Sequence, residues 1–218
     1  MINIVDNFLS IQRNILDQNP QKKPEIIAVS KTFSLDHIKP LLDHGHRHFG
    51  ENKVQEATKK WTQVMTEIKD IKLHMVGSLQ SNKAKDAVRV FSYIHSLDSE
   101  KLANSLKKAE LKFNKKLQYF IQVNIGEEKQ KSGISINELD DFYFFCKNET
   151  KLNIIGLMVL PPNDKNTEIY FKKISEKNKL LNLPELSMGM TADYDLAIKH
   201  YSTYLRIGSA IFGERSIK

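Results

Sequence analysis

The chain has 218 residues, of which 40% are hydrophobic and 27% charged, and its formal net charge is +7. Such a length suits one large domain with a substantial core. No apolar run approaches the roughly 20 residues of a membrane span, so we expect a soluble protein. The N-terminus lacks the basic region of a signal peptide. A single cysteine, Cys146, excludes an internal disulfide and favours a reducing cytoplasm.

The positive charge does not indicate nucleic-acid binding. Only five of the 33 basic residues are arginine, and the lysines are dispersed along the chain. No stripe of aromatic residues is interleaved with them for base stacking. A solvated, lysine-rich surface is the interpretation we adopt, with no nucleic-acid and no membrane partner.

The chain opens with an amphipathic helix, predicted over Ile4–Leu16, in which Ile4, Phe8, Ile11 and Ile15 recur at helical spacing. Short apolar strands and helical patterns then alternate. Strands are expected at 26–29, 47–52 (with a turn), 73–77, 93–97, 117–125, 154–160, 185–188 and 204–207. Helices are expected from the cap at Ser34 through Leu42, over 54–68, 82–90, 99–111, through 139–146, up to about 181, and over 192–201.

Eight strands, each joined to the next by a helix, predict parallel pairing with crossover helices. The expected fold is a single-domain (β/α)8 TIM barrel over residues 1–218, with the first helix as an extra element. An open doubly wound sheet is the alternative. No GxGxxG motif follows the first strand, which disfavours it.

Lys31 follows the buried strand Ile26–Val29. One interpretation is a solvated lysine in a loop. The other is a desolvated amine of lowered pKa that can form a Schiff base. The strand count favours the second, because βα loops at the carboxyl ends of the strands hold the functional groups of such barrels.

Two glycine-containing turns follow the last two strands. Ser187–Thr191 follows the seventh strand, and Arg206–Ala210 follows the eighth. Glycine and small hydroxyl residues let backbone N–H groups approach an anion, and this is the usual phosphate site of the fold. Tight turns that need glycine for backbone geometry are the alternative.

Together these features predict pyridoxal 5'-phosphate as the cofactor. Its aldehyde would join Lys31, its phosphate would bind Ser187, Gly208 and Ser209, and Arg206 would face the ring nitrogen. A cation at that nitrogen would keep it unprotonated and weaken the ring as an electron sink.

At these residues the sequence resembles the pyridoxal phosphate homeostasis protein family, whose fold is similar to the barrel domain of alanine racemase. The matching segments are Ala28–Thr32, His48–Asn52, Val54–Ala57, Gly77 with Leu79–Lys83, Gly156–Met158 with Pro161 and Pro162, Leu186–Met190, and Arg206–Gly208 with Ala210–Gly213.

The resemblance implies that Lys31 carries the cofactor, that Asn52 lies near its ring, and that Ser187, Gly208 and Ser209 hold the phosphate. It also implies a cytosolic protein that binds and buffers the cofactor without a confirmed reaction. The chain departs from the family at Lys53, at Ser78 and over Leu73–Met75. Those departures concern ring packing and any partner surface there.

We expect a monomeric cofactor carrier with no catalytic residue, which hands pyridoxal phosphate to apo-enzymes in transient encounters. A racemase needs a second acid or base on the opposite ring face, and this chain ends shortly after the eighth strand. A racemase-like enzyme using a local Tyr, Cys or His is the alternative, and a barrel for another phosphorylated ligand is a third. His44, His46 and His48 alternate like metal ligands, but they straddle Gly45, and we expect no metal site.

Overall fold

The computed structural model describes residues 3–128 and 130–214. Its strands are parallel, and each pairs with the next in sequence order. Pairing of the last strand with the first closes the sheet into a barrel. The strands are β1 (Glu25–Val29), β2 (His48–Glu51), β3 (Lys72–Met75), β4 (Tyr93–Leu97), β5 (Gln118–Val123), β6 (Ile154–Val159), β7 (Glu185–Ser187) and β8 (Tyr204–Ile207). The predicted TIM-barrel architecture is confirmed, and the open sheet is excluded.

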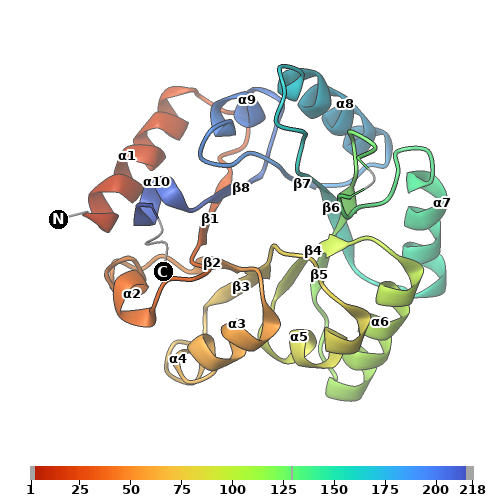
Figure 1. Ribbon diagram of the computed structural model, residues 1–218, viewed down its shortest axis with the longest axis horizontal. Coiled ribbons are helices and arrows are strands. Elements are labelled where there is room, and N and C mark those ends of the chain that lie inside the picture. The colour runs from red at the N-terminus through yellow and green to blue at the C-terminus, as the bar shows by residue number, and fades with distance from the viewer. Residues whose placement is uncertain (1–2, 129, 215–218) are drawn as a thin grey trace.

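Helices surround the strands as an outer ring (Figure 1). They are α1 (Ile4–Asp17), α2 (Leu35–Asp43), α3 (Val54–Trp61), α4 (Val64–Glu67), α5 (Ala84–Val90), α6 (Glu100–Phe113), α7 (Leu139–Phe144), α8 (Thr167–Leu180), α9 (Tyr194–Lys199) and α10 (Ser209–Phe212). A short 3-10 turn, η1 (Ser81–Lys83), precedes α5, and a π-helical turn, η2 (Phe145–Glu149), follows α7. Among the described residues, no helix has the length and apolar content to cross a membrane.

Local chemistry explains where several helices begin. The side chains of Asn3, Ser34 and Ser99 accept hydrogen bonds from backbone N–H groups of the first turns of α1, α2 and α6. Each satisfies a donor that has no partner inside the helix. The apolar faces of these helices then pack on the strands, and every β1 residue after Glu25 is buried. This packing fixes the position of β1, and Lys31 follows two residues after its end.

The helix predicted over 54–68 is in fact two helices, α3 and α4, with a break at Thr62 and Gln63. The hydroxyls of Thr58 and Thr62 donate to the carbonyls of Val54 and Thr58, four residues earlier, at 2.8 and 2.6 Å. Such side-chain bonds compete with the helical ladder and bend it. The spacing of apolar residues does not reveal these side-chain hydrogen bonds, so it predicted one continuous helix.

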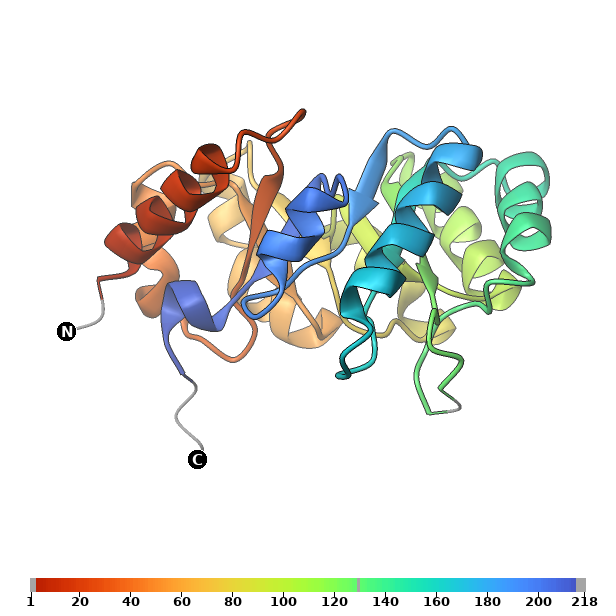
Figure 2. The same cartoon turned by 90° about the horizontal axis from the view of Figure 1, so that it is seen from above.

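The C-terminal segment also differs from the prediction. The helix expected over 192–201 is shorter, because it begins at Tyr194 and ends at Lys199, before Tyr201 adopts a φ of +66°. The four-residue α10 was not predicted, since so short a segment has no readable periodicity. It lies beside α1, where the Asn7 amide donates to the Ile211 carbonyl at 3.1 Å (Figure 1). The loops that follow β5 and β6 extend below the barrel in Figure 2, at the carboxyl ends of the strands.

Candidate functional site

A cavity of about 370 Å³ opens at the carboxyl ends of β1 and β8. This size falls within the usual range of small-molecule sites. Its polar lining includes Lys31, Thr191, Arg206 and Ser209, together with the backbone of Gly208. Its apolar lining consists of Val29, Phe33, Val76, Leu160, Met190 and Ala192. Four residues singled out from the sequence (Lys31, Arg206, Gly208 and Ser209) therefore meet around one cavity.

Lys31 sits in a segment whose two neighbours are fixed by side chains from β2 and α3. The Ser30 hydroxyl donates to Oε1 of Glu51 at 2.7 Å, and the Thr32 backbone N–H donates to Oε1 of Glu56 at 2.7 Å. Thr32 has a φ of +70°, a left-handed conformation that β-branched residues rarely adopt. Strain of this kind persists only where surrounding contacts impose it. The backbone on both sides of Lys31 is thus held in place.

Glu51 is a fully buried carboxylate behind this segment. Besides the Ser30 bond, its Oε1 accepts from Lys60 Nζ at 2.9 Å and from Trp61 Nε1 at 3.0 Å. Lys60 Nζ also donates to the Ser30 carbonyl at 2.9 Å. Because a buried charge needs a partner, Glu51 and Lys60 stabilise one another and tie α3 to the residue before Lys31.

Arg206 brings a buried cation to the floor of the cavity. Its Nη1 donates to the Ser187 hydroxyl at 2.6 Å and its Nη2 to the Val159 carbonyl at 2.8 Å. Burial lowers the pKa of the guanidinium to about 10, and the Asp193 carboxylate opposes that shift. No carboxylate lies within 4 Å of Arg206 in the described residues. The side chain therefore keeps a positive charge at neutral pH beside the space where a ligand would lie.

The structure places Ser187 behind Arg206 instead of in the lining of the cavity. Its side chain is fully buried, and its hydroxyl contacts Arg206 and Nδ1 of His95. Thr191, from the loop after β7, occupies the cavity wall, where its Oγ1 accepts from Ser209 Oγ at 3.3 Å and from the Ala210 backbone N–H at 3.4 Å. Thr191 and Ser209 are the hydroxyl residues at the proposed phosphate position.

Asn52 lies beside a neighbouring cavity of about 460 Å³, which Lys53 and Ser78 also line. Its Oδ1 is buried and has no hydrogen-bond partner among the described residues. A Cβ on Gly77 would stand 2.5 Å from the Asn52 carbonyl oxygen, so only glycine permits this close approach. A buried acceptor without a partner is costly, and its presence is consistent with a ligand-binding role.

The alternating histidines after α2 do not converge. His44 is exposed, His46 Nε2 donates to the His48 carbonyl at 2.8 Å, and His48 Nδ1 contacts His74 Nε2 at 3.0 Å. In the described part of the chain, no group of three or more His, Cys, Asp or Glu side chains could hold a metal ion. His74 and His95, which the sequence analysis did not single out, are fully buried inside the barrel.

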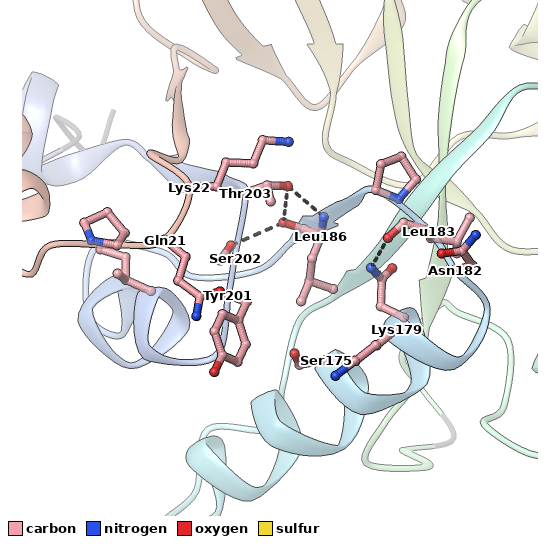
Figure 3. A pocket seen from close by; sticks show the side chains of 14 residues that line it. Gln21, Lys22, Ser175, Lys179, Asn182, Leu183, Leu186, Tyr201, Ser202 and Thr203 are labelled. Carbon is pink, nitrogen blue, oxygen red and sulfur yellow. Dashed lines mark hydrogen bonds between the residues drawn. The ribbon is translucent and has the colours of Figure 1, made fainter.

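A further cavity, of about 460 Å³, lies between α8 and α9, away from Lys31 (Figure 3). It is lined by Lys22, Lys179 and Tyr201, among others. The Thr203 hydroxyl bonds the backbone N–H and carbonyl of Leu186, at 2.7 and 3.2 Å. These bonds, drawn in Figure 3, join Leu186 of β7 to the residue that precedes β8.

Fold and site together define a class: a (β/α)8 barrel with one cavity lined by a lysine just after the first strand and by an arginine, a glycine and a serine at the end of the last strand. The model of the alanine racemase N-terminal domain matches residues 3–216. The chain belongs to the family of pyridoxal phosphate homeostasis proteins. It is 36% identical over 227 residues to the pyridoxal phosphate homeostasis protein of Pasteurella multocida, covering 97% of each chain.

Solved structures agree with this assignment. PipY of Synechococcus elongatus, solved with pyridoxal phosphate bound, is 31% identical, with a TM-score of 0.83 and coverage of 97% of this chain and 100% of PipY. An alanine racemase of Clostridium difficile is similar in fold alone, at 13% identity and a TM-score of 0.74. The match covers 99% of this chain and 58% of the racemase chain. The relatives from Aquifex aeolicus and Haemophilus influenzae carry the same name, pyridoxal phosphate homeostasis protein.

Proposed function

We propose that the protein binds pyridoxal 5'-phosphate reversibly at Lys31 and serves as an intracellular carrier or buffer of this cofactor. The observation that carries the proposal is one cavity lined by Lys31, whose neighbouring backbone is fixed by hydrogen bonds, by the buried Arg206, and by the Gly208–Ser209 turn. The bound cofactor in PipY and the names of the curated relatives support the same ligand.

The residues of the cavity fit this group. When bound, the cofactor supplies an aldehyde carbon that a lysine amine can join covalently. Thr191, Ser209 and the first-turn backbone amides after Gly208 offer hydrogen-bond donors to the phosphate. Arg206 would place its cation near the ring nitrogen and so keep that nitrogen unprotonated. The apolar side chains of Val29, Val76 and Leu160 exclude water from the ring.

Ser187 supports the site from behind, by accepting from Arg206, and Asn52 approaches from the neighbouring cavity with its unpartnered Oδ1. All these residues come from one chain, and we propose that the protein acts as a monomer. We infer that the cytoplasm is where the protein acts and that apo-enzymes are its transient partners.

The racemase-like enzyme is the second candidate. It needs a second acid or base besides Lys31, on the opposite face of the ring. The described residues that line the Lys31 cavity include no Tyr, Cys, His, Asp or Glu side chain that could take this role. We therefore propose that the protein has no catalytic residue and that Lys31 anchors the cofactor.

The test is to add pyridoxal phosphate to the purified protein and to record its absorbance and intact mass after borohydride reduction. We expect one covalent adduct in wild type, none in Lys31→Ala, and an unchanged adduct in the control Lys59→Ala, an exposed lysine of α3. Transfer of the cofactor to an apo-enzyme, measured by regained activity, tests the carrier role. Conversion of an L-amino acid to its D-form by wild type but not by Lys31→Ala would reject that role.

A further inference from the structure

A line of hydrogen-bonded side chains crosses the barrel interior and ends on Arg206. His48 Nδ1 lies 3.0 Å from His74 Nε2, and His74 Nδ1 lies 2.9 Å from His95 Nε2. His95 Nδ1 lies 2.9 Å from Ser187 Oγ, which accepts from Arg206. His74, His95 and Ser187 are fully buried. The line therefore joins the far face of the barrel to the cavity without contact with solvent along its middle.

The outer end of the line is at the amino ends of the strands. The His48 side chain is 20% exposed, and its Nε2 lies 3.7 Å from the carboxylate of Glu25, which is 55% exposed. The pKa of His48 is lowered, mainly by burial. The charge of Glu25 raises this pKa, and the charge of Lys72 lowers it further. Tyr93 and Tyr204 pack beside the His48 ring. Glu25 is thus the anionic group nearest the outer end of the line.

Each of the two inner rings is neutral. Burial, and then the repulsion that a proton on His74 would meet from a protonated His95 or His48, holds the pKa of His74 well below its ordinary value. Burial and the Arg206 charge do the same to the pKa of His95. A neutral imidazole carries one N–H donor and one acceptor nitrogen. Every hydrogen bond in the line must therefore point the same way.

The two ends determine the direction. Arg206 can only donate, and the Glu25 carboxylate can only accept. If Ser187 accepts from Arg206 and donates its proton to Nδ1 of His95, then His95, His74 and His48 all carry their proton on Nε2. The His48 N–H then faces Glu25. The opposite direction would turn the acceptor nitrogen of His48 toward an anion and leave the Ser187 proton without this partner.

We propose that His95 and Ser187 are positioning residues for Arg206, and that Glu25, on the opposite face of the barrel, sets the hydrogen-bond direction on which this positioning depends. The rings are held in place by stacking: His74 lies 4.2 Å from Tyr93 and His95 lies 4.3 Å from Phe120, measured between ring centroids. Because the rings cannot turn freely, a change at Glu25 reaches Arg206 by relocating protons, not by moving side chains.

The direction is tested on the cofactor-free protein by NMR of ¹⁵N-labelled histidine, which reports which ring nitrogen carries the proton. We expect Nε2–H for His74 and His95 in wild type at neutral pH. Glu25→Lys places a cation at the outer end, so we expect both protons to move to Nδ1. The matched control is Glu185→Lys, which makes the same charge change at the start of β7. Since Glu25 is exposed, its replacement leaves the core intact.

Three results would overturn the proposal: Nδ1–H on His95 in wild type, unchanged tautomers in Glu25→Lys, or the same change in Glu25→Lys and in Glu185→Lys. None of these measurements involves the cofactor, so they stand or fall separately from the proposed function.

The effect on Arg206 is tested through cofactor affinity, and this part rests on the proposed function. His95→Leu removes the acceptor for the Ser187 proton, and we expect roughly three- to tenfold weaker binding of pyridoxal phosphate, the size of one lost hydrogen bond. His95→Asn keeps an acceptor near the Nδ1 position and should bind within about twofold of wild type. Equal loss in both variants, with folding intact, would reduce His95 to a packing residue. Failure of wild type to bind would instead reject the proposed function.

Discussion

The carboxylate of Glu56 accepts a hydrogen bond from the backbone N–H of Thr32 at 2.7 Å. Thr32 directly follows Lys31 and holds a φ of +70°, so this bond fixes the segment in a conformation that it would not keep alone. Helix α3, which carries no residue of the cavity lining, thus controls how Lys31 is presented.

Replacement of Glu56 tests this relationship. Glu56→Ala leaves the Thr32 N–H to water and lets the segment relax, so we expect about 1 kcal/mol of lost stability and roughly three- to tenfold weaker cofactor binding. Glu56→Gln keeps a carbonyl acceptor and should approach wild type. Titration with pyridoxal phosphate measures the affinity. Wild-type affinity in Glu56→Ala would show that the bond has no part in presenting Lys31.

The buried pair of Glu51 and Lys60 gives a second prediction. Glu51→Leu removes the nearer carboxylate partner of Lys60, whose side chain is 9% exposed, and leaves it only Glu56 Oε1 at 3.8 Å, so it should cost up to ~3–5 kcal/mol. Adding Lys60→Met removes this poorly compensated charge and should recover at least half of that loss. Urea unfolding of the three proteins measures the difference. A double variant no more stable than Glu51→Leu would mean that the charge is not the cause.

Much of this architecture is predictable from the sequence, because each strand is an apolar run and each helix has one apolar face. The sequence also allows the prediction that four residues lie close together, because parallel strands in a barrel end at the same face. These residues are Lys31, Arg206, Gly208 and Ser209. Ser187 could not be placed in detail: it belongs to β7 itself, and its side chain points into the barrel behind Arg206.

The interior histidines were missed for a related reason. In Tyr93–Leu97 the alternation of a strand puts Tyr93 and His95 on one face, but nothing local tells the barrel interior from the helix-covered side. A polar residue on the inward face needs a partner, and its partners here come from β3 and β7. Such pairing depends on tertiary structure alone.

Arg206 should contribute to binding much more than to stability. Burying this cation costs free energy, and its hydrogen bonds to Ser187 and Val159 do no more than balance that cost. Arg206 therefore makes little net contribution to stability. We expect Arg206→Leu to change the free energy of unfolding by less than about 1 kcal/mol. Its affinity for pyridoxal phosphate should fall at least roughly tenfold. A large loss of stability in a urea titration would contradict the first expectation, and unchanged binding the second.

The histidines should make the protein sensitive to acid. Burial lowers the pKa of His46 to about 4, against 6.5 in the unfolded chain, so between these values the unfolded state binds more protons. Above pH 6.5, His46 therefore does not lower the free energy of unfolding. As the pH drops toward 4, His46 alone lowers that free energy by about 3 kcal/mol. His74 and His95, with lowered pKa values, act in the same direction.

His46→Gln should flatten this part of the pH dependence, while the exposed control His44→Gln should leave it as in wild type. Urea midpoints at pH 7.5 and pH 5 give the comparison. A slope in His46→Gln as steep as that of wild type would assign the acid sensitivity to other groups.

The pairing of β1 with β8 has a consequence for assembly of the molecule. Lys31 follows the first strand and Gly208 follows the last, so the binding site exists only after the two ends of the sheet have met. The neighbouring seam is short, with Ser187 opposite Tyr204 as the registered pair between β7 and β8. At the proposed site, a ligand joined to Lys31 and bound at Gly208 would bridge the β1–β8 junction, and its binding to the folded form alone would stabilise that form by mass action. Uptake of the cofactor would then indicate that these long-range contacts between the first and the last strand are in place.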